Sequence, residues 1–416
     1  MSLLYLLLFV TPFHNDPRLG TVLWDAGGMT ITPIKILGLL TAAVALVAPV
    51  PQDAAPRLRS PLVALFLPFA ILPVLATIGY GLPTPVGAIG QLLSSALLFV
   101  AIISLVRTKE RMFMVARTLV IAFAFGSLWV YKQHLIEHST QAWGVEGESN
   151  YEALMLLLAI PMAFWMARHE QSRGWRRIGL GCGLLLAAAV VLTESRAGII
   201  AGGMIGLLAA IRTRQKLLVS ALLAVSALLV FNYGPAGLSK RFESIKFTGQ
   251  ALNGDEASTR IHVELLKAGL RMMESHPLSG VGLGQFKAVA GDYNPEILKI
   301  ARGTWIAHDT CIQVGSEAGI PALLLFLAML GVALRNFRAA QRSSDERLAA
   351  LGLYMKASLL GISIAALSIS VEFLPFCLII VLSQSLRDIA AAADIERLPV
   401  QDSVATSLPP LRRWVA

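Results

Sequence analysis

Residues 310–334 read TCIQVGSEAGIPALLLFLAMLGVAL, a stretch in which Glu317 is the only charged side chain. A helix of about 20 apolar residues crosses the hydrocarbon core of a bilayer, so this stretch predicts a transmembrane helix. The rest of the chain has the same character, because 56% of its 416 residues are hydrophobic and only 15% are charged. About a quarter of the residues are charged in soluble domains. The composition therefore predicts a membrane protein that crosses the bilayer many times.

About twelve apolar stretches are long enough, or nearly long enough, to cross a membrane. The first, residues 2–13, has no basic segment before it and no small-residue cleavage site, so we expect a helix rather than a removable signal peptide. The expected fold class is an all-α integral membrane protein with about 12 transmembrane helices. The expected spans are residues 2–13, 33–50, 61–80, 89–106, 112–131, 151–167, 178–193, 197–211, 217–231, 310–334, 354–371 and 375–386.

One long polar segment, residues 233–309, interrupts this apolar pattern. Within it, Ser258 or Thr259 is a suitable cap for a helix over residues 260–275, which Pro277 would end. We therefore expect one large periplasmic loop that contains short helices. The expected organisation is transmembrane helices 1–9 over 1–232, the periplasmic loop over 233–309, transmembrane helices 10–12 over 310–388 and a cytoplasmic tail over 389–416.

The charges of the short loops indicate the orientation. Every second short loop is basic, whereas the loops between them carry almost no Lys or Arg, apart from Arg18, Lys132 and Arg196. Membrane proteins keep their basic loops in the cytoplasm, so the net charge of +9 does not require nucleic-acid binding. Both termini are therefore expected in the cytoplasm and the large loop in the periplasm. The basic loops carry Arg57 and Arg59; Arg107, Lys109 and Arg111; Arg168, Arg173, Arg176 and Arg177; Arg212, Arg214 and Lys216; and Arg335, Arg338, Arg342 and Arg347.

Three other patterns are weaker indications of chemistry. The run HLIEH at 134–138 matches a zinc-protease pattern, but its loop has no room for a protease domain. The run GVGLG at 280–284 lacks the spacing of a dinucleotide-binding loop, and a flexible turn is the better interpretation. The three cysteines indicate neither a disulfide framework nor a metal site. We expect no metal and no cofactor.

Two arginines on the expected periplasmic face are candidates for anion binding. Arg196 follows a tight turn between two apolar spans, where an arginine is either an interfacial anchor or part of a functional site. Arg260 lies at the N-terminal end of the expected loop helix, where backbone N–H groups and a guanidinium together suit a phosphate. The same helix is also compatible with an amphipathic segment that lies on the bilayer with its charges solvated. The sequence pattern alone leaves both interpretations open.

Three short segments on the expected outer face form a pattern together. They are Ser195-Arg196-Ala197-Gly198, then Arg260 with the run HPLSGVG at 276–282, then Ala307-His308-Asp309 followed by Gln313 and the run EAGIP at 317–321. This combination resembles the O-antigen ligase and polymerase superfamily, whose members have many helices and one large periplasmic loop before the last few. The chain departs from the usual pattern at Asp309, where Asn is usual, and at His262 and Val263, where an aromatic residue commonly follows the loop arginine. These departures concern the identity of the acceptor more than the class of protein.

The resemblance implies an enzyme of the bacterial inner membrane that acts in surface polysaccharide or lipopolysaccharide biosynthesis. Its donor would be a glycan linked through pyrophosphate to a polyprenyl (undecaprenyl) lipid. Arg196 and Arg260 would bind the pyrophosphate and stabilise the negative charge that develops as it leaves. His308 would act as general base toward the acceptor hydroxyl. Attack opposite the leaving group would invert the anomeric configuration without a metal.

Three further residues would support this site. Glu194 is expected to orient Arg196, and Gln313 and Glu317 are expected to line the same cavity. The acceptor stays open between a lipid A core (ligase), another lipid-linked repeat (polymerase) and a protein hydroxyl. From a different class, a lipid-linked glycan flippase or other transporter would show two related halves with broken helices, a symmetry that the chain does not show. A non-enzymatic membrane scaffold is a further alternative.

Overall fold

The computed structural model describes residues 1–13, 23–26, 29–51, 54–55, 61–79, 81, 86–139, 141–145, 147–212, 254–300, 306–370 and 373–396. Within these ranges the chain forms helices and one short antiparallel hairpin, in which strand β1 (Trp24–Ala26) pairs with β2 (Met29–Ile31). The helices are α1 (Ser2–Val10), η1 (Thr11–Phe13), α2 (Pro33–Val47), α3 (Pro61–Gly79), α4 (Val86–Leu105), α5 (Lys109–Leu135), α6 (Ser149–His169), α7 (Arg173–Leu192), α8 (Arg196–Arg212), α11 (Gly254–Ser275), α12 (Phe286–Tyr293), α13 (Glu296–Ile300), α14 (Thr310–Ala340), α15 (Glu346–Ala365) and α16 (Phe373–Glu396).

Eight of the described helices, α3 to α7 and α14 to α16, are long and apolar enough to cross a membrane. The described part of the chain also has three shorter apolar helices, Ser2–Phe13, Pro33–Val47 and Arg196–Leu207. The protein is therefore an all-α integral membrane protein, apart from the small hairpin. The expected span 217–231 and residues 233–253 of the expected loop lie outside the described residues. The count of about 12 spans stays a prediction.

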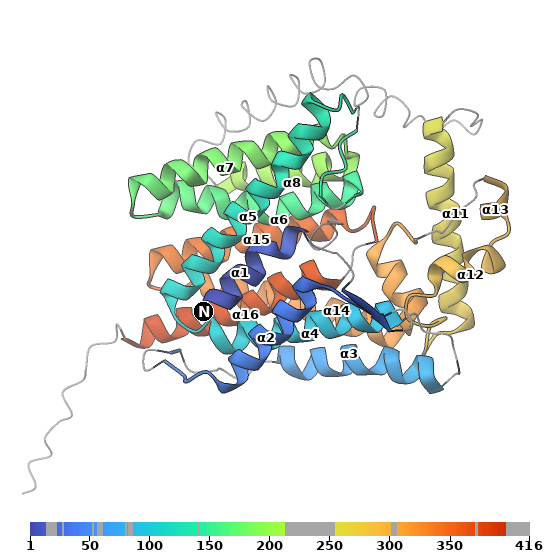
Figure 1. Ribbon diagram of the computed structural model, residues 1–416, viewed down its shortest axis with the longest axis horizontal. Coiled ribbons are helices and arrows are strands. Elements are labelled where there is room, and N and C mark those ends of the chain that lie inside the picture. Colours follow the sequence, from blue (N-terminus) through green and yellow to red (C-terminus); the bar gives the residue numbers. More distant parts are fainter. Residues whose placement is uncertain are drawn as a thin grey trace, which may run out of the picture.

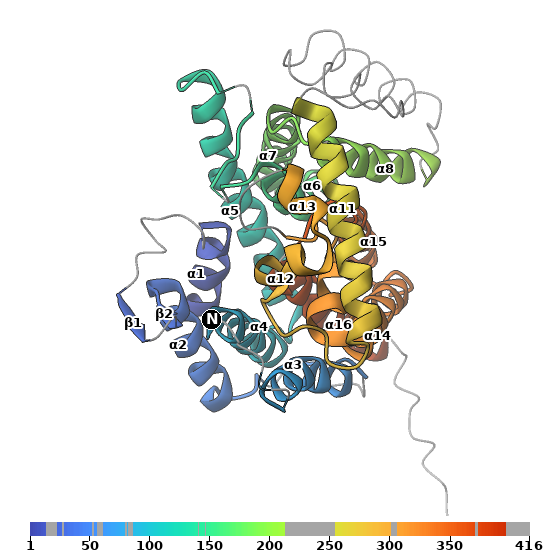
Figure 2. The same cartoon turned by 90° about the vertical axis from the view of Figure 1, so that its right-hand side faces the viewer.

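The membrane helices run side by side, and α11 crosses their direction at one end of the bundle (Figure 1). The view along the bundle shows α11 lying across the ends of the other helices, with α12 and α13 beside it (Figure 2). Three amides tie this layer to the bundle: the N–H groups of Val281 and Ile320 donate to the carbonyls of Ser316 and Pro277, and the N–H of Leu283 donates to the Thr77 hydroxyl. Residues 254–300 and 306–309 thus form a cap on one end of the bundle.

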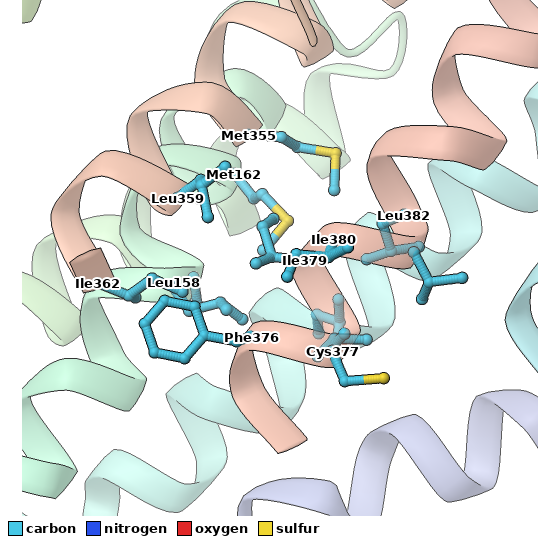
Figure 3. Close-up of a cluster of buried hydrophobic side chains, with 14 of the residues drawn as sticks. Leu158, Met162, Met355, Leu359, Ile362, Phe376, Cys377, Ile379, Ile380 and Leu382 are labelled. Carbon is cyan, nitrogen blue, oxygen red and sulfur yellow. The ribbon is translucent and has the colours of Figure 1, made fainter. Parts of the chain in front are cut away.

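Helices α6 and α16 form the interior of the bundle. In their apolar stretches 78% and 83% of the residues are buried, against 28% in both α3 and α7. A helix that is apolar on all sides suits such an interior position. Figure 3 shows the side chains of α6, α15 and α16 meeting, among them Leu158, Met355, Ile362 and Phe376. The outer helices α3 and α7 are left to face the surrounding lipid.

Expected cytoplasmic loops converge at the end of the bundle away from α11 (Figure 1). Arg117 donates two hydrogen bonds of 2.7 Å to the carboxylate of Glu170, and Arg347 donates a third of 2.9 Å. The side chain of Glu170 is only 1% exposed. A buried carboxylate needs such partners, because an unpaired charge there would be strongly destabilising. This ion cluster joins α5, the end of α6 and the start of α15.

Two membrane helices have ends that differ from the expected ones. Helix α15 begins at Glu346 rather than 354, because the Asp345 side chain accepts hydrogen bonds from the N–H groups of Arg347 and Leu348 and so caps the helix early. It ends at Ala365 rather than 371. Helix α16 continues past the expected end at 386 to Glu396, beyond the expected tail boundary at 388. Its charges do not stop it, since Asp388 accepts hydrogen bonds from Gln384 (2.7 Å) and Arg387 (3.1 Å).

The loop helix also starts earlier than expected. Helix α11 begins at Gly254, so Ser258 and Thr259 lie inside it and the prediction that one of them caps it is wrong. The sequence carries Asp255 and Glu256 directly after Gly254. Acidic residues in a first turn favour a helix start because they complement its dipole. The expected end is confirmed, since α11 stops at Ser275, before Pro277.

Candidate active site

Arg196 is positioned by the turn between α7 and α8. Glu194 in this turn is buried and has a φ of 52°, a backbone conformation that residues other than glycine rarely adopt. The hydroxyl of the buried Ser195 donates to the amide oxygen of Asn150 at 2.7 Å and accepts from the N–H of Gly198 at 3.1 Å. Ser195 therefore caps α8 and ties its first turn to α6. Arg196 is the first residue of α8 and sits on this fixed turn.

Glu317 fixes the loop between α11 and α12 onto α14. Its carboxylate accepts hydrogen bonds from the N–H groups of Gly284 (2.9 Å) and Phe286 (3.0 Å) and from the side-chain amide of Gln313 (2.6 Å). Glu317 is 9% exposed. We expected Gln313 and Glu317 to line the substrate cavity, a role that stays a prediction. In the structure both residues hold backbone groups in place.

Two glycines allow this close approach. Gly280 has φ of 65°, and a side chain there would overlap the backbone carbonyl of Glu317. Gly319 has φ of 83° within α14, at a kink between two helical segments, and a side chain there would overlap the carbonyl of Leu278. The expected flexible turn at GVGLG is thus a turn docked against α14. Only glycine fits at both positions, since both the space and the backbone conformation exclude other residues.

His308 precedes α14 and is held by the groups around it. Asp309 caps the helix, because its Oδ1 accepts from the N–H of Ile312 at 2.9 Å. Either Asp or Asn is a favourable cap, so the departure from the usual Asn leaves the helix start intact. The amide oxygen of Gln313 accepts from the N–H of Ala307 at 2.8 Å. Between these two anchors, His308 adopts a φ of 53°.

The ring of His308 stacks on the ring of His262 from α11. Their centroids are 4.2 Å apart and the ring planes differ by 14°. Nδ1 of His308 is buried and has no hydrogen-bond partner among the described residues. Burial, followed by the charge on His262, lowers the pKa of His308 from 6.5 to about 4. His308 is therefore neutral at pH 7 and can accept a proton.

Arg196 belongs to the same cluster. Burial is the main cause that lowers the pKa of His262, and the positive charge of Arg196 lowers that pKa further. The guanidinium must lie close enough to act on the imidazole through its field. The structure thus brings together Arg196 from α8, His262 from α11 and His308 before α14. These three residues are far apart in the sequence and meet at the capped end of the bundle.

Arg260 lies on another side of α11. It is exposed, and its charge contributes to lowering the pKa of Glu264, after the hydrogen bonds from Lys267 and Asn294. Side chains two positions apart on a helix do not face each other. The side that carries His262 toward His308 is therefore not the side that carries Arg260. The pyrophosphate role of Arg260 stays a prediction, as does the orienting role of Glu194.

His262 is the site residue that the sequence reasoning did not select. Two signals were present. It occupies the position where the related family commonly has an aromatic residue, and it is next to Ile261 on the helix, whose stripe with Leu265, Ala268 and Met272 is buried. A residue at the edge of a buried stripe is partly enclosed and free to meet a neighbouring element. Which element it meets is decided by the packing of α11 on α14.

The HLIEH run has other contacts. Nδ1 of His134 lies 3.2 Å from the carbonyl oxygen of Ser139, and Glu137 pairs with Lys132 at 2.8 Å. Within the described ranges no group of three or more His, Cys, Asp or Glu side chains is arranged to hold a metal ion. The run lies at the C-terminal end of α5, and His134 is in the last turn of that helix together with Lys132.

A family described as O-antigen ligase has a model that matches residues 181–327. No curated protein matches the chain. The matched range begins within α7 and ends within α14, so it contains Arg196, His262 and His308. It also contains the three short segments that carry the resemblance. Over residues 181–327 this membrane protein is therefore similar to the O-antigen ligase family.

Proposed function

We propose that the protein is an inner-membrane glycosyltransferase of the O-antigen ligase type. It takes a glycan from a polyprenyl pyrophosphate donor, with undecaprenyl as the expected lipid, and transfers it to an acceptor hydroxyl. The observation that carries this proposal is the cluster of Arg196, His262 and His308 at one end of the bundle. A cation near a neutral, partly buried imidazole suits a reaction that makes an anionic leaving group and releases a proton.

The reaction is a displacement at the anomeric carbon. The acceptor oxygen forms a bond to this carbon while the bond to the pyrophosphate oxygen breaks, and the bonding electrons leave with the pyrophosphate. His308 takes the proton of the acceptor hydroxyl, and its lowered pKa supports this role because the ring is unprotonated at pH 7. Arg196 and Arg260 stabilise the negative charge that grows on the leaving group. Attack from the opposite face inverts the configuration, and no metal takes part.

The proposed topology has both termini in the cytoplasm and the cluster in the periplasm. It comprises helices 1–9 in residues 1–232, the periplasmic loop in 233–309, helices 10–12 in 310–388 and the tail in 389–416. The alternating basic loops support it, because membrane proteins retain such loops in the cytoplasm. The crossing of α11 over the end of the bundle also supports it (Figure 2), since a helix in that position lies along the membrane surface.

The preferred acceptor is a lipid A core, as for a ligase, because the matching family carries that description. Transfer to another lipid-linked repeat, as by a polymerase, uses the same chemistry and is the second candidate. A deletion strain separates the two. Loss of long lipopolysaccharide with accumulated lipid-linked polymer indicates a ligase, whereas accumulated single lipid-linked repeats indicate a polymerase.

The enzymatic proposal is tested with purified protein in liposomes. We expect transfer of glycan from polyprenyl pyrophosphate to the acceptor, with release of polyprenyl pyrophosphate, and undiminished transfer after treatment with EDTA. Strong inhibition by EDTA would contradict the metal-free mechanism. Movement of the donor across the bilayer without any glycan transfer would instead indicate a flippase.

A further inference from the structure

His262 stacks on the base of the candidate site and is also affected by the charge of its cation. One side of its ring stacks on His308, at 4.2 Å between centroids, and its protonation responds to the charge of Arg196. The proposed mechanism assigns His262 no step. A ring that only packed against His308 would need no titratable group, and the related family commonly has an aromatic residue there.

We propose that His262, in its protonated form, is a second cation for the donor pyrophosphate beside Arg196, and that it keeps the stacked His308 unprotonated. This inference rests on the proposed glycosyltransferase function and deepens it. It concerns the binding of a pyrophosphate diester, in which each phosphate carries one negative charge and neither titrates near neutral pH. The proton on His262 comes from solvent when the donor binds and returns to solvent when the pyrophosphate leaves.

The charges near His262 decide whether its ring is protonated. The charge of Arg196 on α8 acts on it, the His308 ring stacks on it from the segment before α14, and Asp309 caps α14 next to His308. On α11 itself, Arg260 and Glu264 lie on a different side of the helix. Without donor, Arg196 disfavours a second positive charge on His262. A bound pyrophosphate offsets the guanidinium and favours that charge.

The stacking then separates the roles of the two histidines. Two rings at 4.2 Å interact strongly enough that a proton on one disfavours a proton on the other. Uptake of a solvent proton by His262 when the donor binds therefore leaves His308 neutral, which is the form that a general base requires. His308 thus stays unprotonated both before and after the donor binds. His262 acts as a binding and positioning residue, and His308 receives the acceptor proton.

The position of Arg260 strengthens the assignment. Arg260 is exposed, and its field acts on Glu264, whereas His262 is the residue of α11 that contacts His308. A second positive charge next to Arg196 and His308 is therefore supplied from α11 most directly by His262. Arg260 is placed to meet the donor from the exposed side of the helix.

The test is His262→Phe, which keeps an aromatic ring to stack on His308 but cannot carry a charge. We expect the donor KM of the wild type to rise as the pH is raised from 6 to 8, and that of His262→Phe to be independent of pH. At pH 6 the variant should have a donor KM about tenfold or more above the wild type, with a nearly unchanged kcat at saturating donor, as the loss of one charge-assisted contact predicts. The difference in donor KM between the variant and the wild type should become smaller at pH 8. Val263→Ala, at an exposed neighbouring position on α11, is the matched control and should behave like the wild type.

A second measurement reports the proton itself. Calorimetry of donor binding to the full-length protein in nanodiscs, without acceptor, in two buffers of different ionisation enthalpy should show proton uptake by the wild type and none by His262→Phe. Equal donor KM values and equal proton uptake in the two proteins would overturn the inference while the glycosyltransferase function stood. If the donor binds with proton uptake but no glycan is transferred to any acceptor, the proposed function is wrong, while pyrophosphate recognition by His262 stands.

Discussion

At His308 the backbone, the burial and the neighbouring ring all act on one imidazole. Its φ of 53° is stabilised by the cap at Asp309 and by the bond from Ala307 to Gln313. Its Nδ1 faces the interior without a partner among the described residues. Backbone strain and a buried polar atom that lacks a partner both cost stability, and such costs concentrate at functional sites. These two costs point to a functional role for His308, and they do not depend on the family match.

Replacement of His308 tests its role as base. His308→Ala should lower transfer by about 10²–10⁴-fold, the usual contribution of a general base, while donor binding persists. His308→Gln keeps a hydrogen-bonding group but takes no proton near neutral pH, so it should be as inactive as the Ala variant. Rates measured with purified donor and acceptor would decide this. Substantial activity of the Gln variant would leave His308 only a positioning role.

The pH dependence of the wild type follows from the same residue. His308 is the base in its deprotonated form, which predominates above its pKa of about 4. At saturating donor, kcat should therefore be flat between pH 6 and 8 and should fall only toward pH 4. A loss of kcat with an apparent pKa between 6 and 7 would show that His308 is not shielded as its burial indicates.

Lysine substitutions test the two arginines. Arg196→Lys and Arg260→Lys retain the positive charge but lose the planar fork that binds phosphate in two places. Both should lower transfer at normal expression, with the larger loss for Arg196, since its charge acts on His262, which stacks on His308. Near wild-type transfer by both variants in reconstituted membranes would remove the arginines from pyrophosphate binding.

Among the elements, the contact between the α11–α12 loop and α14 matters most for the site. The kink of α14 at Gly319 exposes backbone groups that the loop satisfies, and the Glu317 carboxylate accepts hydrogen bonds from backbone N–H groups of the loop. Helices α11 and α14 are thereby fixed in register, and this register brings His262 onto His308. A defect in this contact should therefore reduce both stability and transfer.

Gly280→Ala tests that contact. The added methyl would overlap the Glu317 carbonyl, and Gly280 also has a φ of 65° that alanine rarely adopts. We expect a loss of about 1–3 kcal/mol in stability, seen as a lower Tm, together with reduced transfer. Gly331→Ala, on the partner helix α14 but with no atom near the added methyl, is the control and should leave both unchanged. An unaltered Tm for Gly280→Ala would mean that the loop is free to move off α14.

For the whole molecule, the two ends of the bundle differ in chemistry. At one end Arg117 and Arg347 pair with the buried carboxylate of Glu170. The other end is crossed by α11 (Figure 1), whose His262 stacks on His308. The basic end matches the loops that the positive-inside rule keeps in the cytoplasm. In the proposed topology the candidate site faces the periplasm, where the donor glycan and its acceptor would meet.

Cysteine labelling tests this orientation. In a background with Cys182, Cys311 and Cys377 replaced by Ala, a single cysteine at exposed Lys287 on α12 should react with a membrane-impermeant maleimide in intact spheroplasts. A single cysteine at exposed Arg342, in the turn between α14 and α15, should react only after lysis. The reverse pattern would place the candidate site in the cytoplasm and would contradict the proposed mechanism.

The sequence by itself determined the membrane class, the alternation of basic loops and the resemblance to the O-antigen ligase family, while the roles of Arg196 and His308 stay predictions. These properties depend on local composition and spacing, which can be seen in the sequence without a structure. It did not determine where α11 and α15 begin, because those starts depend on individual capping and first-turn residues rather than on apolarity. It also could not place His262 on His308 or assign the carboxylate of Glu317 to the loop. Only tertiary packing decided these contacts, because they join residues that are distant in sequence and depend on how α11 docks against the kink of α14.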